Sequence, residues 1–249
     1  MSYLVYCIVA ADRHEPRPRL RFLGYPRACI AVRACELGAV ASETSPADLA
    51  PDVARLLAYS KVVEWYNRDG TVIPMRYGCI FDTPAEIRRL LDDRQREYRR
   101  LLDDLDGCAE MSAQVALDEP GPFAGLRANL CSPLLAQFAG RRDRRPGIAY
   151  LADRSEYYAS REDLDQRREE ICNAIRGSAQ GTFVRCSSEY GERGGRGFLA
   201  LHFLVSRHGI DRFRKALQPL TAHAASSVAV TGPWPPYNFV RSSAARLKT

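Results

Sequence analysis

The stretch from residue 182 to residue 206, TFVRCSSEYGERGGRGFLALHFLVS, decides the fold of the second half of the chain. Its ends, Thr182 to Glu189 and Gly197 to Ser206, alternate as strands do, and the glycine-rich turn YGERGGRG between them predicts a hairpin. The flanking elements expected from periodicity are a strand over 110–117, helices over 154–176 and 209–223, and a last strand over 226–230. The resulting order, βαββαβ, is that of the split ferredoxin-like plan.

The first half of the chain combines three strand candidates with two helices. The strands are expected over 3–11, 28–34 and 37–42. Ser45 followed by Pro46 predicts the start of a helix that runs to about Tyr66. The apolar face expected for this helix consists of Leu49, Val53, Leu56, Leu57 and Ser60.

A second helix in this half is expected to begin after Thr83, where Thr-Pro-Ala-Glu repeats the capping pattern. Its apolar face consists of Ile87, Leu90, Leu91, Tyr98, Leu101, Leu102 and Leu105. Gly107 ends the helix and marks the predicted domain boundary. Between the two helices an extended segment contains Pro74, which is expected at a sheet edge or a bulge.

Composition is that of a folded protein, with 46% hydrophobic and 27% charged residues among 249 and a formal net charge of +6. Charges or turn residues interrupt every apolar run well before the roughly 20 residues of a membrane helix. The first residues are typical of a strand rather than of a signal peptide. The eight cysteines contain no CxxC pair, which favours buried thiols in a reducing cytosol over a metal site or disulfides.

No pattern typical of catalysis or of cofactor binding is present. The four histidines lie on different predicted elements, without a defensible nucleophile spacing, and the nucleotide-binding and hydrolase motifs are missing. The glycines of YGERGGRG precede a strand, whereas a phosphate-binding loop precedes a helix. We therefore expect neither an enzyme nor a cofactor or metal site.

The segment RGFLALHF, residues 196–203, suggests one alternative, an RNA-binding module on a ferredoxin-like fold. Arg196, Gly197, Phe198 and Phe203 fit the third strand of an RNA-recognition motif. Strand alternation, however, places Ala200 where a second stacking ring is needed. Both faces of the strand are rich in apolar residues, which favours a strand covered on both sides.

Four segments resemble the GvpF/GvpL family of gas vesicle proteins. TGPWPPYNFV at 231–240 is similar to the C-terminal motif of that family. YLVYCIVAA at 3–11 resembles its first strand, VIPMRYGCIF at 72–81 its central LPxRFGxxF segment, and GIAYLADR at 147–154 its GxAYLxxR element. The four occur in the family's order and span nearly the whole chain, with Tyr77 where phenylalanine is usual.

The resemblance implies an α+β protein of two domains. These are an N-terminal modified ferredoxin-like α/β sandwich over 1–107 and a C-terminal ferredoxin-like domain over 108–230, followed by a Pro-rich tail over 231–249. It also implies an accessory protein of gas vesicle formation, located in the cytoplasm and associated with gas vesicles. The expected partners are the hydrophobic shell protein and other accessory proteins, bound in a chaperone-like or adaptor role, with no nucleic acid and no membrane.

The candidate interaction or tail-docking residues are Arg76, Tyr77, Trp234, Tyr237 and Phe239. Three prolines between residues 231 and 240 forbid a helix and stiffen this run. Two interpretations remain open for its aromatic side chains. They either strap the tail against the body of the protein or contact a partner directly.

Overall fold

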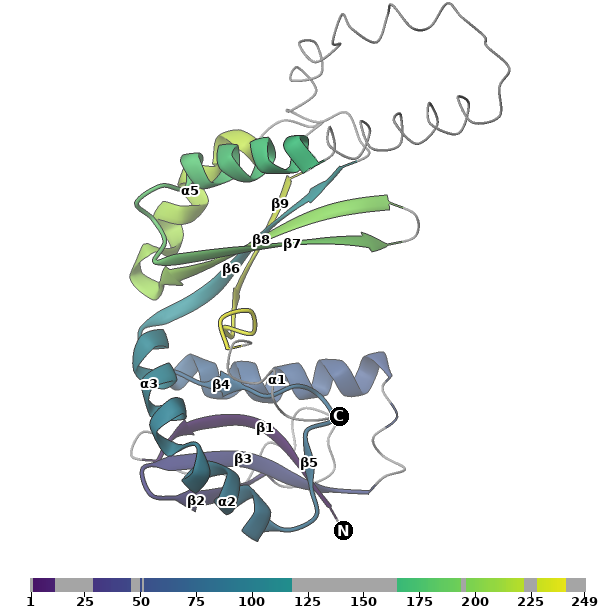
Figure 1. Cartoon of the computed structure of the whole chain (residues 1–249), viewed down its shortest axis with the longest axis vertical. Coiled ribbons are helices and arrows are strands. Elements are labelled where there is room, and N and C mark those ends of the chain that lie inside the picture. The colour runs from purple at the N-terminus through teal and green to yellow at the C-terminus, as the bar shows by residue number, and fades with distance from the viewer. Residues whose placement is uncertain are drawn as a thin grey trace, which may run out of the picture. The chain divides into compact units, whose positions relative to one another are not determined.

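The computed structural model describes residues 2–11, 29–45, 50, 52–117, 165–193, 196–221 and 228–240 of the chain. It has a mixed α/β fold with two antiparallel sheets (Figure 1). The chain forms two compact units, each taken over its described residues: Met1–Met111, Phe203–Ile210 and Gly232–Thr249 make the first, and Ser112–His202 and Asp211–Thr231 the second. The domain limits expected from the sequence stay a prediction, as does the structure of 147–154, which lies outside the described residues.

The sheet of the first unit has five strands in the order β2-β3-β1-β4, with β5 also paired to β1. Their bounds are Ser2–Ala10 (β1), Cys29–Ala34 (β2), Leu37–Thr44 (β3), Ile73–Pro74 (β4) and Ile80–Phe81 (β5). The three strands predicted at the start of the chain are thus confirmed. Pro74 lies in the terminal strand β4, opposite Cys7, as its missing N–H group requires.

The central strand β1 contributes side chains to two hydrophobic cores, one on each face of the sheet, and contains a β-bulge. The register with β3 shifts between Val5 and Cys7, so Tyr6 and Cys7 face the same side of the sheet. On that side they pack with α1, Val53–Asp69, through its residues Tyr59, Val62, Val63 and Tyr66. On the other side Val5 and Ile8 pack with α2, Pro84–Asp93, and α3, Gln95–Leu105.

Helix α1 begins later than the sequence predicted. Asp52 is the N-cap, and its side chain accepts a hydrogen bond from the backbone N–H of Arg55 at 2.8 Å. The expected start at Ser45-Pro46 is wrong, because Ser45 and Ala50 are not helical; 46–49 lie outside the described residues. The helix ends before Gly70, close to the predicted end.

The second predicted helix of the first unit is two helices. Thr83 caps α2 as expected, accepting a hydrogen bond from the N–H of Glu86. The chain then turns at Arg94, whose ψ of 18° interrupts the helix before α3 begins. The predicted apolar face is nonetheless buried or half-buried throughout, with Ile87, Leu91 and Leu105 fully enclosed.

The second unit contains a four-stranded sheet in the order β7-β8-β6-β9. In chain order its elements are β6 (Cys108–Ala116), a helix over 165–178, β7 (Arg185–Arg193), β8 (Arg196–Ser206), α5 (Ile210–Thr221) and β9 (Val228–Trp234). Figure 1 shows the two helices over one face of this sheet. Residues 154–164 of the predicted helix lie outside the described residues.

Strand β9 runs further than expected, through Pro233 to Trp234. The first half of TGPWPPYNFV is therefore strand, where the sequence predicted a tail from residue 231. Proline is tolerated there because β9 is the terminal strand of its sheet. Both α5 and the hairpin strands β7 and β8 confirm the elements predicted around YGERGGRG.

Candidate docking surface

The segment after β9 packs onto the first unit. Phe239 and Val240 belong to the hydrophobic core on the α2/α3 side of the first sheet, together with Leu204. Tyr237 packs against the core on the α1 side. This segment therefore contributes side chains to both cores of the unit.

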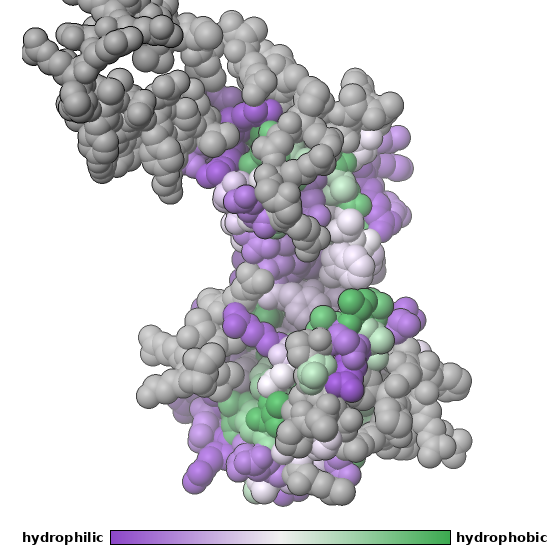
Figure 2. All heavy atoms as spheres, turned by 90° about the vertical axis from the view of Figure 1, so that its right-hand side faces the viewer, coloured by the Kyte–Doolittle hydropathy of each residue, from purple (hydrophilic) through white to green (hydrophobic). Residues whose placement is uncertain are grey.

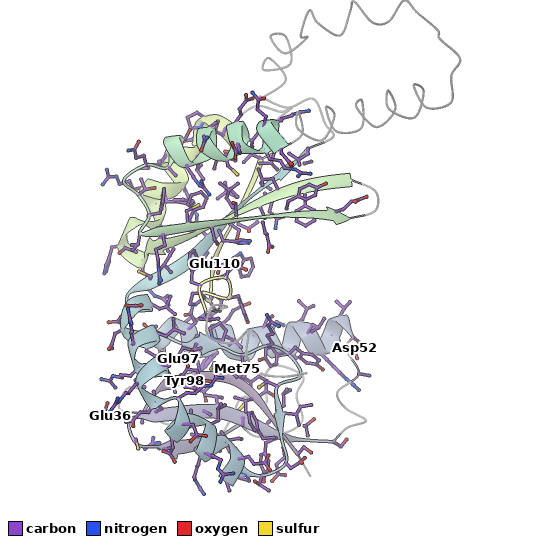
Figure 3. All side chains as sticks on the ribbon, viewed as in Figure 1. Glu36, Asp52, Met75, Glu97, Tyr98 and Glu110 are labelled. Atoms are coloured by element: carbon purple, nitrogen blue, oxygen red, sulfur yellow. The ribbon has the colours of Figure 1, made fainter. Side chains whose placement is uncertain are left out.

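A buried carboxylate holds the same segment in place. Glu110 of β6 is buried, and its Oε2 accepts a hydrogen bond from the backbone N–H of Asn238 at 2.9 Å. Its Oε1 accepts a second bond from the side-chain amide of Asn238 at 2.6 Å. Figure 3 labels Glu110 beside the short loop that follows β9. Two bonds to one charged acceptor fix the backbone of this loop as well as its side chain.

Gly232 allows β9 to approach β6 closely. Its φ is +114°, a conformation that residues with a side chain rarely adopt. A Cβ atom at this position would lie 2.7 Å from the carbonyl oxygen of Glu110 and 2.9 Å from the sulfur of Met111. Glycine is thus required at this position of the TGPWPPYNFV motif.

The loop between β4 and β5 packs against α1 through tyrosines. The hydroxyl of Tyr59 donates to the carbonyl oxygen of Met75 at 2.8 Å and lies 3.1 Å from those of Val5 and Tyr6. The ring of Tyr77 meets that of Tyr59 edge-on, with centroids 5.3 Å apart. Burial raises the pKa of Tyr59 and of Tyr237 well above the usual range. Both hydroxyls therefore stay protonated and packed.

The structure separates the five residues singled out from the sequence. Tyr77 and Tyr237 pack against the same core, so the VIPMRYGCIF and TGPWPPYNFV motifs meet on the α1 side of the sheet. Phe239 lies in the opposite core. Arg76 is exposed, and Trp234 is 41% exposed. Only the last two side chains therefore present much of their surface to solvent.

The most exposed apolar surface of the first unit lies on the opening turns of α1. Val53 is 74% exposed, Leu57 55% and Leu56 43%. We call these three residues the α1 apolar patch. In Figure 2, which views the right-hand side of Figure 1 where α1 begins, hydrophobic atoms gather at that end of the helix. Asp52, labelled in Figure 3, marks its start.

The sequence analysis placed Val53, Leu56 and Leu57 on the buried face of the helix. This prediction is wrong, because all three side chains are exposed. The helix is apolar on two sides, and the side with Tyr59, Val62 and Val63 is the one that packs on the sheet. In the sequence, the hydroxyl of Tyr59 makes that side appear less apolar. In the structure this hydroxyl is buried because backbone carbonyl oxygens accept its hydrogen bond. Exposed aliphatic side chains gathered on one helix make this surface a candidate interaction site.

Cations flank the patch along the exposed side of α1. Lys61, one turn beyond Leu57, and Arg68 are both exposed, and Glu64 between them is half-buried. Within the described part of the chain, neither Lys61 nor Arg68 forms an ion pair. The exposed side of α1 thus combines apolar side chains at its start with positive charge further along the helix.

Strand β8 in the second unit does not offer the stacking platform of an RNA-binding module. The ring of Phe198 lies against Gly191 of the neighbouring strand β7. Ala200 and His202 on the same face are buried, as are Leu199, Leu201 and Phe203 on the other. Bases need exposed rings on which to stack, so the alternative function loses its structural basis.

Ser112, His202 and Glu189 form a polar row across the same sheet. This row could not be predicted from the sequence. The Nδ1 atom of His202 lies 2.9 Å from the hydroxyl oxygen of Ser112 on β6, and its Nε2 lies 3.3 Å from a carboxylate oxygen of Glu189 on β7. Ser112 is buried in the middle of a strand, out of reach of a substrate. The row therefore pairs the buried hydroxyl of Ser112 with the imidazole of His202 inside the sheet.

The described residues contain neither a candidate metal site nor a candidate membrane-spanning helix. No group of three or more histidine, cysteine, aspartate or glutamate side chains there is placed to hold a metal ion. In the same part of the chain, none of the helices combines the length and the apolar character needed to cross a membrane.

Comparison with known proteins identifies the family. Residues 2–241 match the family model described as gas vesicle synthesis protein GvpL/GvpF. Gas vesicle protein F of Streptomyces sp. (strain CB03234) is 28% identical over 246 residues, which cover 96% of this chain and all of that protein. The chain therefore belongs to the GvpL/GvpF family, which gives it a role in gas vesicle formation.

Solved structures show the same fold. The crystal structures of the gas vesicle protein GvpF from Anabaena sp. PCC7120 and from Microcystis aeruginosa each match with a TM-score of 0.70. Each alignment covers 96% of this chain and 98% of the other, at 17% sequence identity. The resemblance to the family seen in the sequence is thus confirmed.

Proposed function

We propose that this protein is an accessory protein that binds the hydrophobic gas vesicle shell protein during assembly and holds it until it joins the growing shell. Family membership supplies the process, and the α1 apolar patch is the observation that supports the binding. The protein acts in the cytoplasm, associated with gas vesicles, and other accessory proteins are further partners. It works as a chaperone or adaptor, without catalysis.

The physical need for such a protein follows from the nature of its partner. A subunit that assembles into a shell around gas carries apolar surface that aggregates in water. A binding surface that covers part of this area keeps the subunit soluble and is released on assembly. Val53, Leu56 and Leu57 offer a small apolar contact of this kind, which suits reversible binding.

The architecture of the units forms part of the proposal. We infer that the second unit follows the ferredoxin-like plan, because its element order and its strand order β7-β8-β6-β9 agree with it. The first unit is a modified version, in which α1 and the α2/α3 pair lie on opposite faces of the sheet. The packing of Tyr237 and Phe239 favours a strap for the proline-rich segment.

The test is co-expression of the full chain with the shell protein, followed by affinity capture and by measurement of soluble shell protein. We expect the doubly substituted variant Val53→Glu, Leu57→Glu to lose capture while its thermal unfolding midpoint is unchanged, because both side chains are exposed. Val184→Glu in the second unit changes another exposed valine and is the matched control.

Two outcomes contradict different parts of the proposal. If the unaltered chain neither captures the shell protein nor keeps it soluble, the proposed function is wrong. If the unaltered chain does both and the double variant does so equally well, the function stands and the α1 apolar patch is not the binding surface.

A further inference from the structure

A cavity of about 530 Å³ lies in the second unit, between the helix over 165–178 and the sheet. Arg168, Cys172 and Arg176 line it from one side of the helix, Ser188 and Tyr190 from β7, and Leu199 from β8. Its volume falls within the range of about 300 to 1,000 Å³ that small-molecule sites occupy. No part of the proposed shell-protein binding uses these residues.

Each of the two arginines has one nitrogen atom that is buried without a hydrogen-bond partner among the described residues. These atoms are the Nε of Arg168 and the Nε of Arg176. Buried polar groups are nearly always paired, so these two unpaired donors leave both guanidinium groups of the cavity wall incompletely hydrogen-bonded. Two such donors from guanidinium groups favour an anion.

The two arginines differ in how their charge is balanced. Arg168 donates from Nη1 to the carboxylate of Asp165 and stacks over the ring of Tyr190, with its Cζ 3.5 Å from the ring centroid. Its charge is therefore compensated within the protein, and its planar group is held in place. The stacked guanidinium group can therefore contact a ligand without further loss of conformational freedom.

Arg176 has no carboxylate partner in the described part of the chain. Its Nη2 lies 3.5 Å from the hydroxyl oxygen of Ser188, at the limit of a hydrogen bond. Burial raises the pKa of the Cys172 and Cys186 thiols, and Arg176 opposes this shift at both. The two thiols are therefore neutral and do not balance the charge of Arg176. A half-buried cation without a counter-ion is unfavourable.

Three carboxylates near the cavity do not supply that counter-ion. Asp165 is engaged by Arg168, and Glu189 lies 3.3 Å from Nε2 of His202. Glu169 is exposed at the rim of the cavity and forms no ion pair among the described residues. Its negative charge opposes anion binding and offers a way to strengthen it by mutation.

We propose that this cavity binds a small tetrahedral oxyanion of the phosphate class, held by the guanidinium group of Arg176 together with that of Arg168 and the hydroxyl of Ser188. Arg176 supplies the uncompensated charge, and the other two groups supply direction. The cavity is larger than one phosphate ion, so it accepts either free phosphate or the phosphate group of a small phosphomonoester.

The test is isothermal titration calorimetry on the full chain with inorganic phosphate, and separately with glycerol phosphate, at constant ionic strength. We expect saturable binding by the unaltered chain. Arg176→Gln is expected to weaken it by about tenfold or more, the loss of a charge-assisted hydrogen bond. Arg167→Gln removes the same charge from the same helix, outside the cavity lining, and is expected to bind nearly as well as the unaltered chain.

Glu169→Gln provides a gain of function and is expected to bind phosphate more tightly, because it removes the opposing charge at the rim. Tighter binding of glycerol phosphate than of phosphate identifies a phosphomonoester as the ligand, and the reverse identifies free phosphate. No saturable binding by the unaltered chain, or equal weakening by Arg176→Gln and Arg167→Gln, overturns the proposal. If Arg176→Gln does not fold, unchanged affinity in Glu169→Gln overturns it.

Discussion

Replacing Phe239 by alanine tests whether the segment after β9 stabilises the first unit. Phe239 is 9% exposed and lies in the core formed with α2, α3 and Leu204. Removal of a buried phenylalanine ring costs about 3 to 5 kcal/mol, the sum of lost burial and an unfilled cavity. The short stretch around Phe239 can partly collapse into the space, so we expect about 3 kcal/mol.

The assay is urea unfolding followed by tryptophan fluorescence. The chain has two tryptophans, Trp65 and Trp234, and both belong to the first unit, so the signal reports on that unit. With a slope of about 2 kcal/mol per molar urea, a loss of about 3 kcal/mol lowers the midpoint by about 1.5 M. Trp234→Ala is expected to cost less, because that side chain is 41% exposed.

The control is Val53→Ala, which removes a similar type of side chain from an exposed position. Its effect is expected to stay within about 0.5 kcal/mol. If Phe239→Ala and Val53→Ala unfold at the same urea concentration, Phe239 does not contribute to the core, and the interpretation of the segment as a strap is refuted.

Three further changes act on the same unit. Gly232→Ala is expected to cost about 1 to 3 kcal/mol, because the new Cβ meets the Glu110 carbonyl at 2.7 Å and the backbone has a φ of +114°. Asn238→Ala is expected to cost about 1.5 to 3 kcal/mol, since it removes the side-chain donor to the buried Glu110 carboxylate. Stability is expected to fall as pH rises from about 9 to 11, because burial raises the pKa of Cys29 and of Cys79 to about 11.

Urea unfolding measures each of these effects. Gly232→Ala with unaltered stability contradicts the close approach of β9 to β6. A double-mutant cycle of Glu110→Ala with Asn238→Ala that shows simple additivity contradicts the hydrogen bond. In the unfolded chain the two thiols lose their protons near pH 9, whereas in the folded protein they keep them to about pH 11. Each buried thiol therefore lowers the free energy of unfolding only above about pH 9, where the unfolded chain gains by deprotonation. Between pH 9 and 11 the free energy of unfolding is expected to fall by up to about 1.4 kcal/mol per pH unit for each thiol. A free energy of unfolding that stays constant to pH 11 contradicts this prediction.

Much of the fold could be predicted from local patterns. Strands such as β1 and β3 and the cap at Thr83 follow directly from alternation and capping chemistry. The start of α1 could not, because two capping signals compete, Ser45-Pro46 and Asp52, and the tertiary fold selects the second. The turn at Arg94 that separates α2 from α3 could not be predicted either, because the helical spacing of apolar residues in the sequence continues across it.

The candidate surface was harder to predict, because burial depends on what packs against a helix. Val53, Leu56 and Leu57 have the spacing of a core face, and only the position of the sheet shows that Tyr59, Val62 and Val63 face it instead. Likewise, Arg176 is one of 36 basic residues in the sequence, and its lack of a carboxylate partner is visible only in three dimensions.

The route of the chain through the first unit affects how the protein emerges from the ribosome. That unit is built from three separate stretches, and the last begins at Gly232, after the whole second unit has been synthesised. At about 5 to 20 residues per second, Phe239 and Val240 are added about 7 to 27 seconds after the end of α3, and only then can the core around β1 be completed. During synthesis the first unit thus exposes for a time the kind of apolar surface that we propose it covers on its partner.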